Sequence, residues 1–422
     1  MHHSTKTIFA WSGGLALSGL LWGCTMGNTS GDLAAERFGD LRYALPASPE
    51  TLSALSVADS CPPTAGLPGE SSVVRRLPYL QQLTDKSVRI LWTVDGPLEN
   101  AQVMLRDSGG SVLGAVGATP DITAKPPEGA TQWQADVTGL SADTRYCYTV
   151  EAGGAILRSA SFRTAPAGDS AAPVKFVALG DSGAGGADQL AVLEQIRRYP
   201  FDFLIHMGDL AYNVGARTEI ERNFFRVYGE TLERFAMFPA SGNHEYDTEE
   251  AAPFREAFSL FENGGPEGVE RWYSYDWGDV HFVVLDTERV SPAQVAWLEA
   301  DLTANQRPWV VAYLHKAPYS SGEHLSYMDV RASFTPLFEK YGVKLVLAGH
   351  DHNYERTAPQ NGVTYIVTGG GGVGTRAVGR SEFTEFAESV CHFLYVVVEG
   401  GTMTVHAIDA TGVEFDSARL SL

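Results

Sequence analysis

From Leu77 to about residue 165, apolar and polar residues alternate in short runs that are separated by turn-forming residues. A period of two places successive side chains on opposite faces of a strand, and several short strands at this spacing are typical of a β-sandwich. The strands are expected at residues 87–94, 101–105, 132–137 and 144–150. Trp92 lies in an early strand, where it could fill the sandwich core. The pattern predicts an N-terminal all-β domain over residues 76–165.

The pattern changes after a hinge rich in Ala, Gly, Pro and Ser at residues 165–173. Continuous apolar runs predict buried strands, and they lie at residues 174–179, 201–207, 280–285, 309–314 and 343–347. Helices are expected near residues 188–198 and 218–234. A third helix begins after Ser291, with Pro292 at its first position and Gln294 three residues after the cap. Alternating strands and helices predict an α/β layered domain over residues 173–422.

The first 75 residues have a different composition. Lys6 precedes a 16-residue apolar stretch, residues 8–23, which resembles an export signal and is shorter than the roughly 20 residues that span a membrane. Residues 21–24 resemble a bacterial lipoprotein cleavage box, in which Cys24 would be lipidated; plain cleavage or anchoring is the alternative. Residues 1–24 are therefore expected to direct export, to the periplasm, to the outer membrane or cell surface as a lipoprotein, or to the medium. Residues 25–75, rich in Gly, Ser, Ala and Pro, are predicted to be a tether.

The four cysteines are too few and too dispersed for a disulfide scaffold or a thiolate zinc site. After export, three of them allow at most one intramolecular bridge and one odd thiol. On the strand alternation, Cys147 points away from Tyr146 and Tyr148. A structural role or a bridge to Cys61 is therefore expected for Cys147, rather than chemistry.

The chain has 51 Asp and Glu residues against 31 Lys and Arg, a net charge of −20, with no dense basic run. Such a surface repels phosphate backbones, so nucleic-acid binding is not expected. A small phosphorylated substrate is compatible with this charge, because bound cations can reverse the local potential of a pocket.

Polar residues of the kinds that bind cations follow four of the predicted strands and a further short apolar run at residues 238–240, at the carboxyl ends where open α/β sheets place their sites. Each signal is weak by itself, because a Gly-Asp pair after a strand is usually a turn and a buried His is usually a satisfied core residue. Together, two Asp, one Tyr, one Asn and three His in this order are hard to explain as turns. The five motifs are Gly180-Asp181, Gly208-Asp209 with Tyr212, Gly242-Asn243-His244-Glu245, His315, and Gly349-His350-Asp351-His352.

This set of motifs resembles that of the purple acid phosphatases, a branch of the metallophosphoesterases. Most metallophosphoesterases have a His two residues after the first Asp; here Gly183 stands at that place and Tyr212 is available instead, as in the purple branch. The resemblance extends from Leu77 to Leu422, because these enzymes often carry a fibronectin type III-like domain before the catalytic one. It implies that the sandwich is fibronectin-like, with Tyr146 as its corner tyrosine, and that the catalytic domain is a β-sandwich flanked by helices.

The resemblance also implies a dinuclear metal centre. The first metal would be held by Asp181, Tyr212 and His352, the second by Asn243, His315 and His350, and Asp209 would bridge the two. Phenolate and carboxylate are hard anionic ligands that suit Fe(III), whereas two imidazoles and an amide suit a divalent ion such as Zn, Mn or Fe(II). Such a pair makes hydroxide available to attack a phosphate ester, so no covalent enzyme intermediate is required.

Two further histidines are implied to be catalytic. His244 would face the phosphoryl group, and His324, nine residues after His315, could protonate the leaving alkoxide. The alternative for His324 is a residue on a loop surface. His206 is expected to be structural or to support the ligands from behind. The glycine-rich segment 369–374 lacks the Lys-Ser/Thr ending of a nucleotide phosphate loop and is expected to form a backbone turn beside the metals.

The sequence thus predicts an exported, two-domain acid phosphatase that hydrolyses phosphate monoesters. A phosphodiesterase or a nucleotide-hydrolysing enzyme on the same site is the first alternative, because loops set substrate choice. The alternative from a different class is a cell-surface binding protein with a catalytically dead α/β domain.

Overall fold

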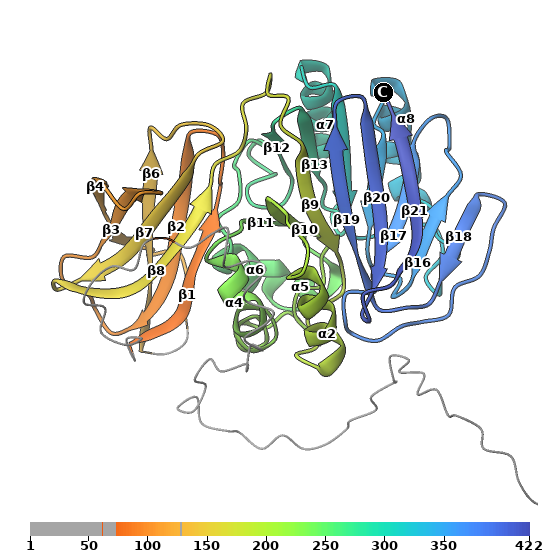
Figure 1. Cartoon of the computed structure of the whole chain (residues 1–422). Helices are drawn as coiled ribbons and strands as arrows, with labels where there is room; N and C mark the ends of the chain where they lie inside the picture. Colours follow the sequence, from red (N-terminus) through yellow and green to blue (C-terminus); the bar gives the residue numbers. More distant parts are fainter. Residues whose placement is uncertain (1–60, 62–72, 127–128) are drawn as a thin grey trace, which may run out of the picture.

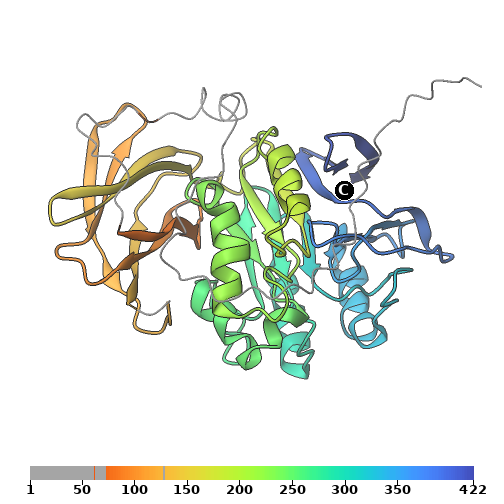
Figure 2. The same cartoon turned by 90° about the horizontal axis from the view of Figure 1, so that it is seen from below.

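The computed structural model describes Cys61, residues 73–126 and residues 129–422. The predicted export segment 1–24 with Cys24, and most of the predicted tether, lie outside the described residues. An all-β region forms one end of the molecule, and two larger sheets with their helices form the rest (Figures 1 and 2). Within the described ranges, no helix is long and apolar enough to cross a membrane.

The N-terminal region consists of two four-stranded antiparallel sheets. One sheet has the order β1 (Val74–Gln81), β2 (Ser87–Asp95), β6 (Ala130–Thr138) and β5 (Thr119–Pro120), and the other β4 (Val112–Gly117), β3 (Gln102–Asp107), β7 (Arg145–Ala152) and β8 (Ala155–Arg163). All four predicted strands are present, and Trp92 is fully buried opposite Trp133 of the neighbouring strand. The other four strands lay outside the predicted ranges: β4, β5, β8 and β1, which begins at Val74 inside the predicted tether.

Two local features of this region were predicted from Tyr146 and Cys147. The Tyr146 hydroxyl accepts a hydrogen bond from the backbone N–H of Ser141 at 2.9 Å, as expected of a corner tyrosine. Of the two expectations for Cys147, a structural role or a bridge to Cys61, the structure has the Cys61–Cys147 bridge. The expected odd thiol is not found, because no cysteine in the described part of the chain is free, Cys391 included.

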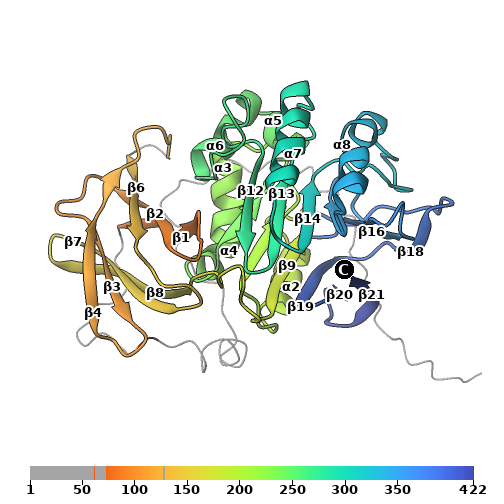
Figure 3. The same cartoon turned by 90° about the horizontal axis from the view of Figure 1, so that it is seen from above.

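The C-terminal region contains two mixed sheets that lie face to face, with helices on their outer faces (Figure 3). The first sheet has the order β11 (Met237–Pro239), β10 (Phe203–His206), β9 (Val174–Leu179), β19 (His392–Glu399), β20 (Thr402–Asp409) and β21 (Glu414–Ser421). The second has the order β12 (Tyr273–Trp277), β13 (Val280–Val284), β14 (Trp309–Leu314), β15 (Leu345–Ala348), β17 (Thr364–Thr368), β16 (Tyr354–Thr357) and β18 (Thr384–Glu388). The architecture is the predicted α/β layering.

Strand β14 shows why its sequence is apolar at every position. Trp309, Val311 and Tyr313 belong to the core that includes the space between the sheets. The alternate residues Val310, Ala312 and Leu314 pack under helices α7 (Pro292–Ala304) and α8 (Met328–Tyr341). A strand covered on both faces needs apolar residues on both.

The helices follow the predictions only in part. Helix α2 (Ala187–Ile196) and the run α3 (Arg217–Glu219), η2 (Ile220–Phe225) and α4 (Arg226–Leu232) lie where helices were expected, and η2 is a π-helical turn. Helix α7 begins as predicted, because the Ser291 side chain accepts a hydrogen bond from the Gln294 backbone N–H. The remaining helical segments were not predicted; they are α8, α5 (Asn243–Tyr246), η3 (Glu249–Ala251) and α6 (Ala252–Ala257).

The two regions are joined by a buried interface. Arg76 of β1 is 4% exposed, forms an ion pair with Glu221 of η2 and lies over the Phe225 ring, with Cζ 3.9 Å from the ring centre. On the opposite sheet, Arg158 of β8 forms an ion pair with Glu233 at 2.7 Å. One hydrophobic core runs through both regions.

Candidate metal centre

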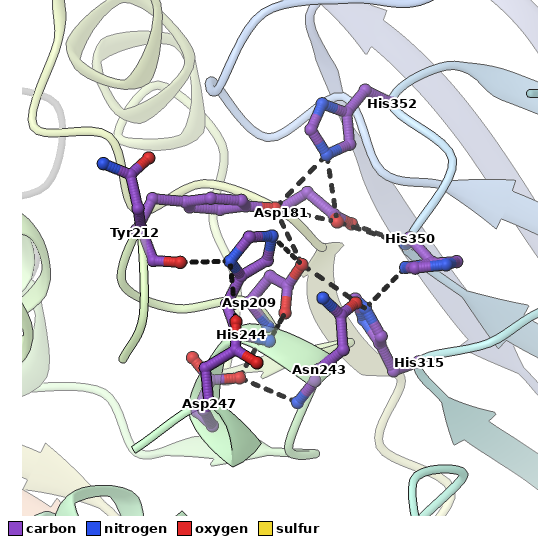
Figure 4. Close-up of polar contacts among 12 residues, drawn as sticks. Asp181, Asp209, Tyr212, Asn243, His244, Asp247, His315, His350 and His352 are labelled. Carbon is purple, nitrogen blue, oxygen red and sulfur yellow. Dashed lines mark hydrogen bonds and ion pairs between the residues drawn. The ribbon is translucent and has the colours of Figure 1, made fainter. Parts of the chain in front are cut away.

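The predicted ligands lie on loops that follow the carboxyl ends of five strands. Strands β9, β10 and β11 are parallel neighbours in the first sheet, and β14 and β15 are parallel neighbours in the second. Parallel strands end at one edge of a sheet, so the loops from each sheet gather there. The loops of the two sheets meet, and their side chains converge from both sides (Figure 4).

Left-handed backbone turns occur at three of these positions. Asp181, Asp209 and His350 have φ angles of 58°, 56° and 70°, a region that non-glycine residues rarely occupy and that concentrates at functional sites. Two glycines give the loops the room to meet. A Cβ atom on Gly208 would lie 2.8 Å from His315 Nδ1, and one on Gly242 would lie 2.2 Å from Asp209 Oδ1. Gly208 and Gly242 are therefore required by close packing.

A first cluster is formed by Asp181, Tyr212 and His352. The Tyr212 hydroxyl oxygen lies 3.1 Å from Asp181 Oδ1 and 3.2 Å from His352 Nε2, and His352 Nε2 lies 3.5 Å from the same Asp181 oxygen. All three side chains are buried. Tyr212 also lies 2.9 Å from Asp209 Oδ2.

A second cluster is formed by Asn243, His315 and His350. His315 Nε2 lies 3.0 Å from Asn243 Oδ1 and 3.1 Å from His350 Nδ1. It also lies 3.4 Å from Asp209 Oδ2, and atoms of Asp209, His315 and His350 are close enough together to hold one ion. The same Asp209 oxygen therefore faces both clusters, and the structure brings all seven predicted ligands together.

The pKa values of the ligand side chains result from two effects, burial and the charges of neighbouring groups. Burial would raise the pKa of Asp209, but His315 and His244 outweigh it and hold this pKa below its usual range. Burial opposes protonation of His315, yet the carboxylate of Asp209 raises its pKa to about 10. Burial, together with the neighbouring His315, lowers the pKa of His350 to about 2. A neutral His350 keeps the lone pair that a metal ligand needs.

The donor set of the first cluster fits a cation. Asp181 and Asp209 are at most 1% exposed, and both carboxylates lie about one hydrogen-bond length from the Tyr212 oxygen. Burial and these two carboxylates raise the pKa of Tyr212. Buried anionic oxygens at such distances need a nearby positive charge, and a cation there would also favour the phenolate.

Glu245 is a site residue whose role sequence reasoning missed. It is fully buried, and its Oε2 accepts hydrogen bonds from the backbone N–H groups of Asp209 at 2.8 Å and Gly242 at 2.7 Å, while Oε1 accepts one from Leu210 at 2.8 Å. One carboxylate thus holds the loops after β10 and β11 together. The sequence feature that could have indicated this role is the position of Glu245 in the Gly-Asn-His-Glu motif.

The histidines proposed for catalysis lie at the edge of the centre. His244 Nδ1 is hydrogen-bonded to the Asn213 carbonyl oxygen, Nε2 lies 3.8 Å from Asp209 Oδ2, and the side chain is 25% exposed. The His324 ring is stacked on the His350 ring with centres 4.1 Å apart, so His324 lies at the site and is exposed there.

Three other predictions concern the surroundings of the site. His206 is buried and bonded to Ser182 at 2.9 Å, and burial lowers its pKa to about 3, which agrees with a structural role. In segment 369–374, Gly371 N–H donates to the Gly180 carbonyl oxygen at 2.9 Å, so it forms the predicted backbone turn beside the site. Just beyond it, the Arg376 guanidinium donates to His324 Nε2, a contact that sequence reasoning missed.

Comparison with known proteins agrees with this geometry. Residues 174–354 match the family described as calcineurin-like phosphoesterases, so this part of the chain is a calcineurin-like metallophosphoesterase domain. Among curated proteins, it is 30% identical over 205 residues to human acid phosphatase type 7, covering 41% of this chain and 46% of that protein. It is also 30% identical over 258 residues to phosphoenolpyruvate phosphatase of Allium cepa, covering 55% and 51%. The chain spans about half the length of these relatives.

A solved structure extends the likeness in fold. The purple acid phosphatase from yellow lupin (Lupinus luteus) seeds superposes with a TM-score of 0.73 at 20% identity, covering 82% of this chain and 74% of that one. This coverage exceeds the part of the chain that follows residue 173, so the match includes N-terminal strands. The fold is purple acid phosphatase-like, and the fibronectin-like character of the N-terminal sheets stays a prediction.

Proposed function

We propose that this protein is a dinuclear metallophosphohydrolase that cleaves phosphate monoesters, an acid phosphatase of the purple type. The observation that carries the proposal is the pair of donor clusters that share Asp209 Oδ2. A single structural metal would not need seven side chains from five loops. Two sites bridged by one carboxylate have the arrangement that clamps the attacking and leaving oxygens of an in-line displacement.

On the chemistry of the donors, the proposal places Fe(III) in the first cluster and a divalent ion, Zn, Mn or Fe, in the second. When bound, such a pair supplies Lewis acidity and makes hydroxide available at mild pH. Asp181, Asp209 and Tyr212 contribute the anionic oxygens that balance the higher charge. The positive charge of the bound metals would attract a small phosphorylated substrate to the site, although the net charge of the chain is negative.

The two edge histidines take different roles. Because the Asn213 carbonyl oxygen binds Nδ1 of His244, its Nε2 is left to face the phosphoryl oxygens and stabilise their developing charge. His324 is the proposed acid for the leaving alkoxide. To act as an acid, His324 must be an imidazolium with a proton on each nitrogen. Its Nε2 accepts from Arg376 in this structure, so that contact has to open before His324 can donate a proton.

The setting of the enzyme is also a proposal. The sequence of residues 1–24 supports export, and attachment to a membrane through a lipidated Cys24 is part of the proposal. Phosphodiesters or nucleotides are the alternative substrates, because the loop that carries His324 is exposed and borders the site. A catalytically dead binding protein is the alternative of a different class.

The test is a substrate panel on the metal-replete full chain, with Asp209→Ala as the inactive control and elemental analysis of both. We expect fast hydrolysis of phosphate monoesters, slow hydrolysis of diesters, and iron plus a divalent metal in the wild type. Faster cleavage of diesters or nucleotides would favour the first alternative. A metal-replete wild type that is inert across the panel would overturn the proposal in favour of the binding protein.

A further inference from the structure

His350 has different neighbours at its two ring nitrogens. Nδ1 lies 3.1 Å from His315 Nε2, on the side of the second cluster. Nε2 lies 2.7 Å from the hydroxyl oxygen of Tyr327. An imidazole can coordinate a metal through only the nitrogen that carries no proton, so the contact at Nε2 bears on what Nδ1 can do.

The Tyr327 hydroxyl is held in place by the fold. Tyr327 is the residue before helix α8, its N–H donates to the Ala317 carbonyl oxygen at 2.9 Å, and its own carbonyl oxygen accepts from the Arg331 N–H at 2.9 Å. Lys316 Nζ lies 5.3 Å from the centre of the Tyr327 ring and is paired with Glu288 at 2.6 Å. The start of helix α8 therefore sets the position of this phenol.

We propose that Tyr327 is a positioning residue for the second metal: its oxygen accepts the Nε2–H of His350 and so fixes the tautomer whose Nδ1 lone pair faces Asp209 and His315. The inference rests on the dinuclear site proposed above. A neutral hydroxyl acceptor orients the ring without adding a negative charge to the second cluster. Ligand histidines commonly have such a partner on their other nitrogen.

The role is specific to one half of the centre. Tyr327 contacts His350, whereas no hydrogen bond in the described part of the chain links its side chain to Asp181, Tyr212 or His352. Removing the hydroxyl should therefore weaken the second metal and leave the first. Loss of such a partner typically weakens metal binding by roughly 10–100-fold.

The experiment compares Tyr327→Phe with wild type and with Tyr319→Phe. Tyr319 lies in the same loop, but its ring packs on Tyr365 at 4.6 Å between centres, so it controls for loss of a loop hydroxyl. The metal-free full chain is titrated with Zn²⁺ against a chelator. We expect one of two Zn²⁺ equivalents to bind about 10–100-fold more weakly in Tyr327→Phe, and neither to change in Tyr319→Phe.

Two further readouts separate positioning from folding. The visible absorption of iron-reconstituted protein, which reports on Tyr212, should be the same in all three proteins. Independently of any variant, NMR of the zinc-loaded wild type should show the proton of His350 on Nε2. Unchanged affinity in Tyr327→Phe, or a proton on Nδ1, would overturn the inference while leaving the proposed function intact. Loss of both Zn²⁺ equivalents with a lowered unfolding temperature would also overturn it. A wild type that binds fewer than two Zn²⁺ would instead remove the dinuclear site itself.

Discussion

The two clusters of the metal centre are built differently around one shared carboxylate. The first cluster adds a carboxylate and a phenol to a single imidazole, all buried. The second adds two imidazoles and an amide, and its Asn243 is partly exposed. The difference between the clusters is one of charge: the additional acidic donors lie on one side of Asp209, which is the arrangement that the proposed pair of cations with unequal charge would require.

The loop after β15 serves both clusters. His350 belongs to the second cluster and His352 to the first. The left-handed backbone at His350 turns the chain directly after the strand, where these two ligands lie. The Asp181 carboxylate also accepts the His350 backbone N–H at 2.9 Å. Acidic donors of one cluster thus help to place the ligand loop of the other.

The largest expected effect comes from removing one imidazole of either cluster. His352→Ala should lose the metal of the first cluster and His315→Ala that of the second, and each should lower kcat by on the order of 10³-fold, because both charges act on the phosphoryl group. Elemental analysis and kinetics on the two variants check this. If both variants lost the same metal, the division into two clusters would be wrong.

Tyr212→Phe sharpens the comparison by removing only the phenol oxygen. Without the phenolate, the first cluster resembles a divalent site, so we expect the visible charge-transfer band to disappear and activity to fall by roughly 10–100-fold. Visible spectra and iron content provide the measurement. A band that persists in Tyr212→Phe would show that another ligand produces it.

Glu245→Gln tests the scaffold that both clusters share. An amide can accept fewer of the backbone N–H bonds and brings its own N–H groups against them, so we expect a loss of about 3 kcal/mol in unfolding free energy. Equilibrium unfolding of metal-free protein measures it. Stability equal to wild type would mean that the loops hold their shape without this carboxylate.

The smallest expected effect concerns His281, a histidine outside the metal centre whose positive charge is neutralised by two carboxylates of the protein. His281 lies between Asp276 at 2.7 Å and Asp301 at 2.8 Å. Burial opposes protonation, but these carboxylates raise its pKa to about 9. A raised pKa stabilises the fold fully below the unfolded value of about 6.5, and this stabilisation is lost as pH rises through 9.

His281→Gln should therefore cost about 1–2 kcal/mol at pH 6 and little above pH 9, with activity unchanged. Arg307, which also pairs with Asp276, keeps that carboxylate satisfied in the variant. Thermal unfolding at both pH values measures the difference. If the loss of unfolding free energy in His281→Gln did not shrink with rising pH, the ion pairs of His281 would contribute nothing to stability and the loss would come from packing alone.

The strands and ligand positions were predictable because each has a short-range signal. The apolar runs before Asp181, Asp209 and His315 identify buried strands, and the polar residues after them identify the edge where the loops meet. Helix α8 was missed although Val330, Phe334 and Phe338 recur at helical spacing, because Pro336 lies inside it and argues against a helix. Its packing on the second sheet supplies the stabilisation that the local sequence lacks.

Glu245 and Tyr327 were missed for a different reason. Their contacts join loops that are far apart in sequence: Glu245 contacts Asp209, and Tyr327 contacts His350. Neither a Glu nor a Tyr by itself indicates such a contact. The Arg376 to His324 contact spans 52 positions. Long-range hydrogen bonds between loops become visible only when the loops have been placed in space.

The buried pairing of Arg76 with Glu221 has a practical consequence for work on this protein. A truncated chain that begins after residue 165 would leave Glu221 without its partner and would expose the Phe225 ring on which Arg76 rests. Removing one member of a buried pair is far more damaging than removing both. The minimal unit for expression, crystallisation or display should therefore begin no later than Cys61, which also keeps the Cys61–Cys147 bridge, and the N-terminal sheets are best regarded as part of one folded unit rather than as a detachable module.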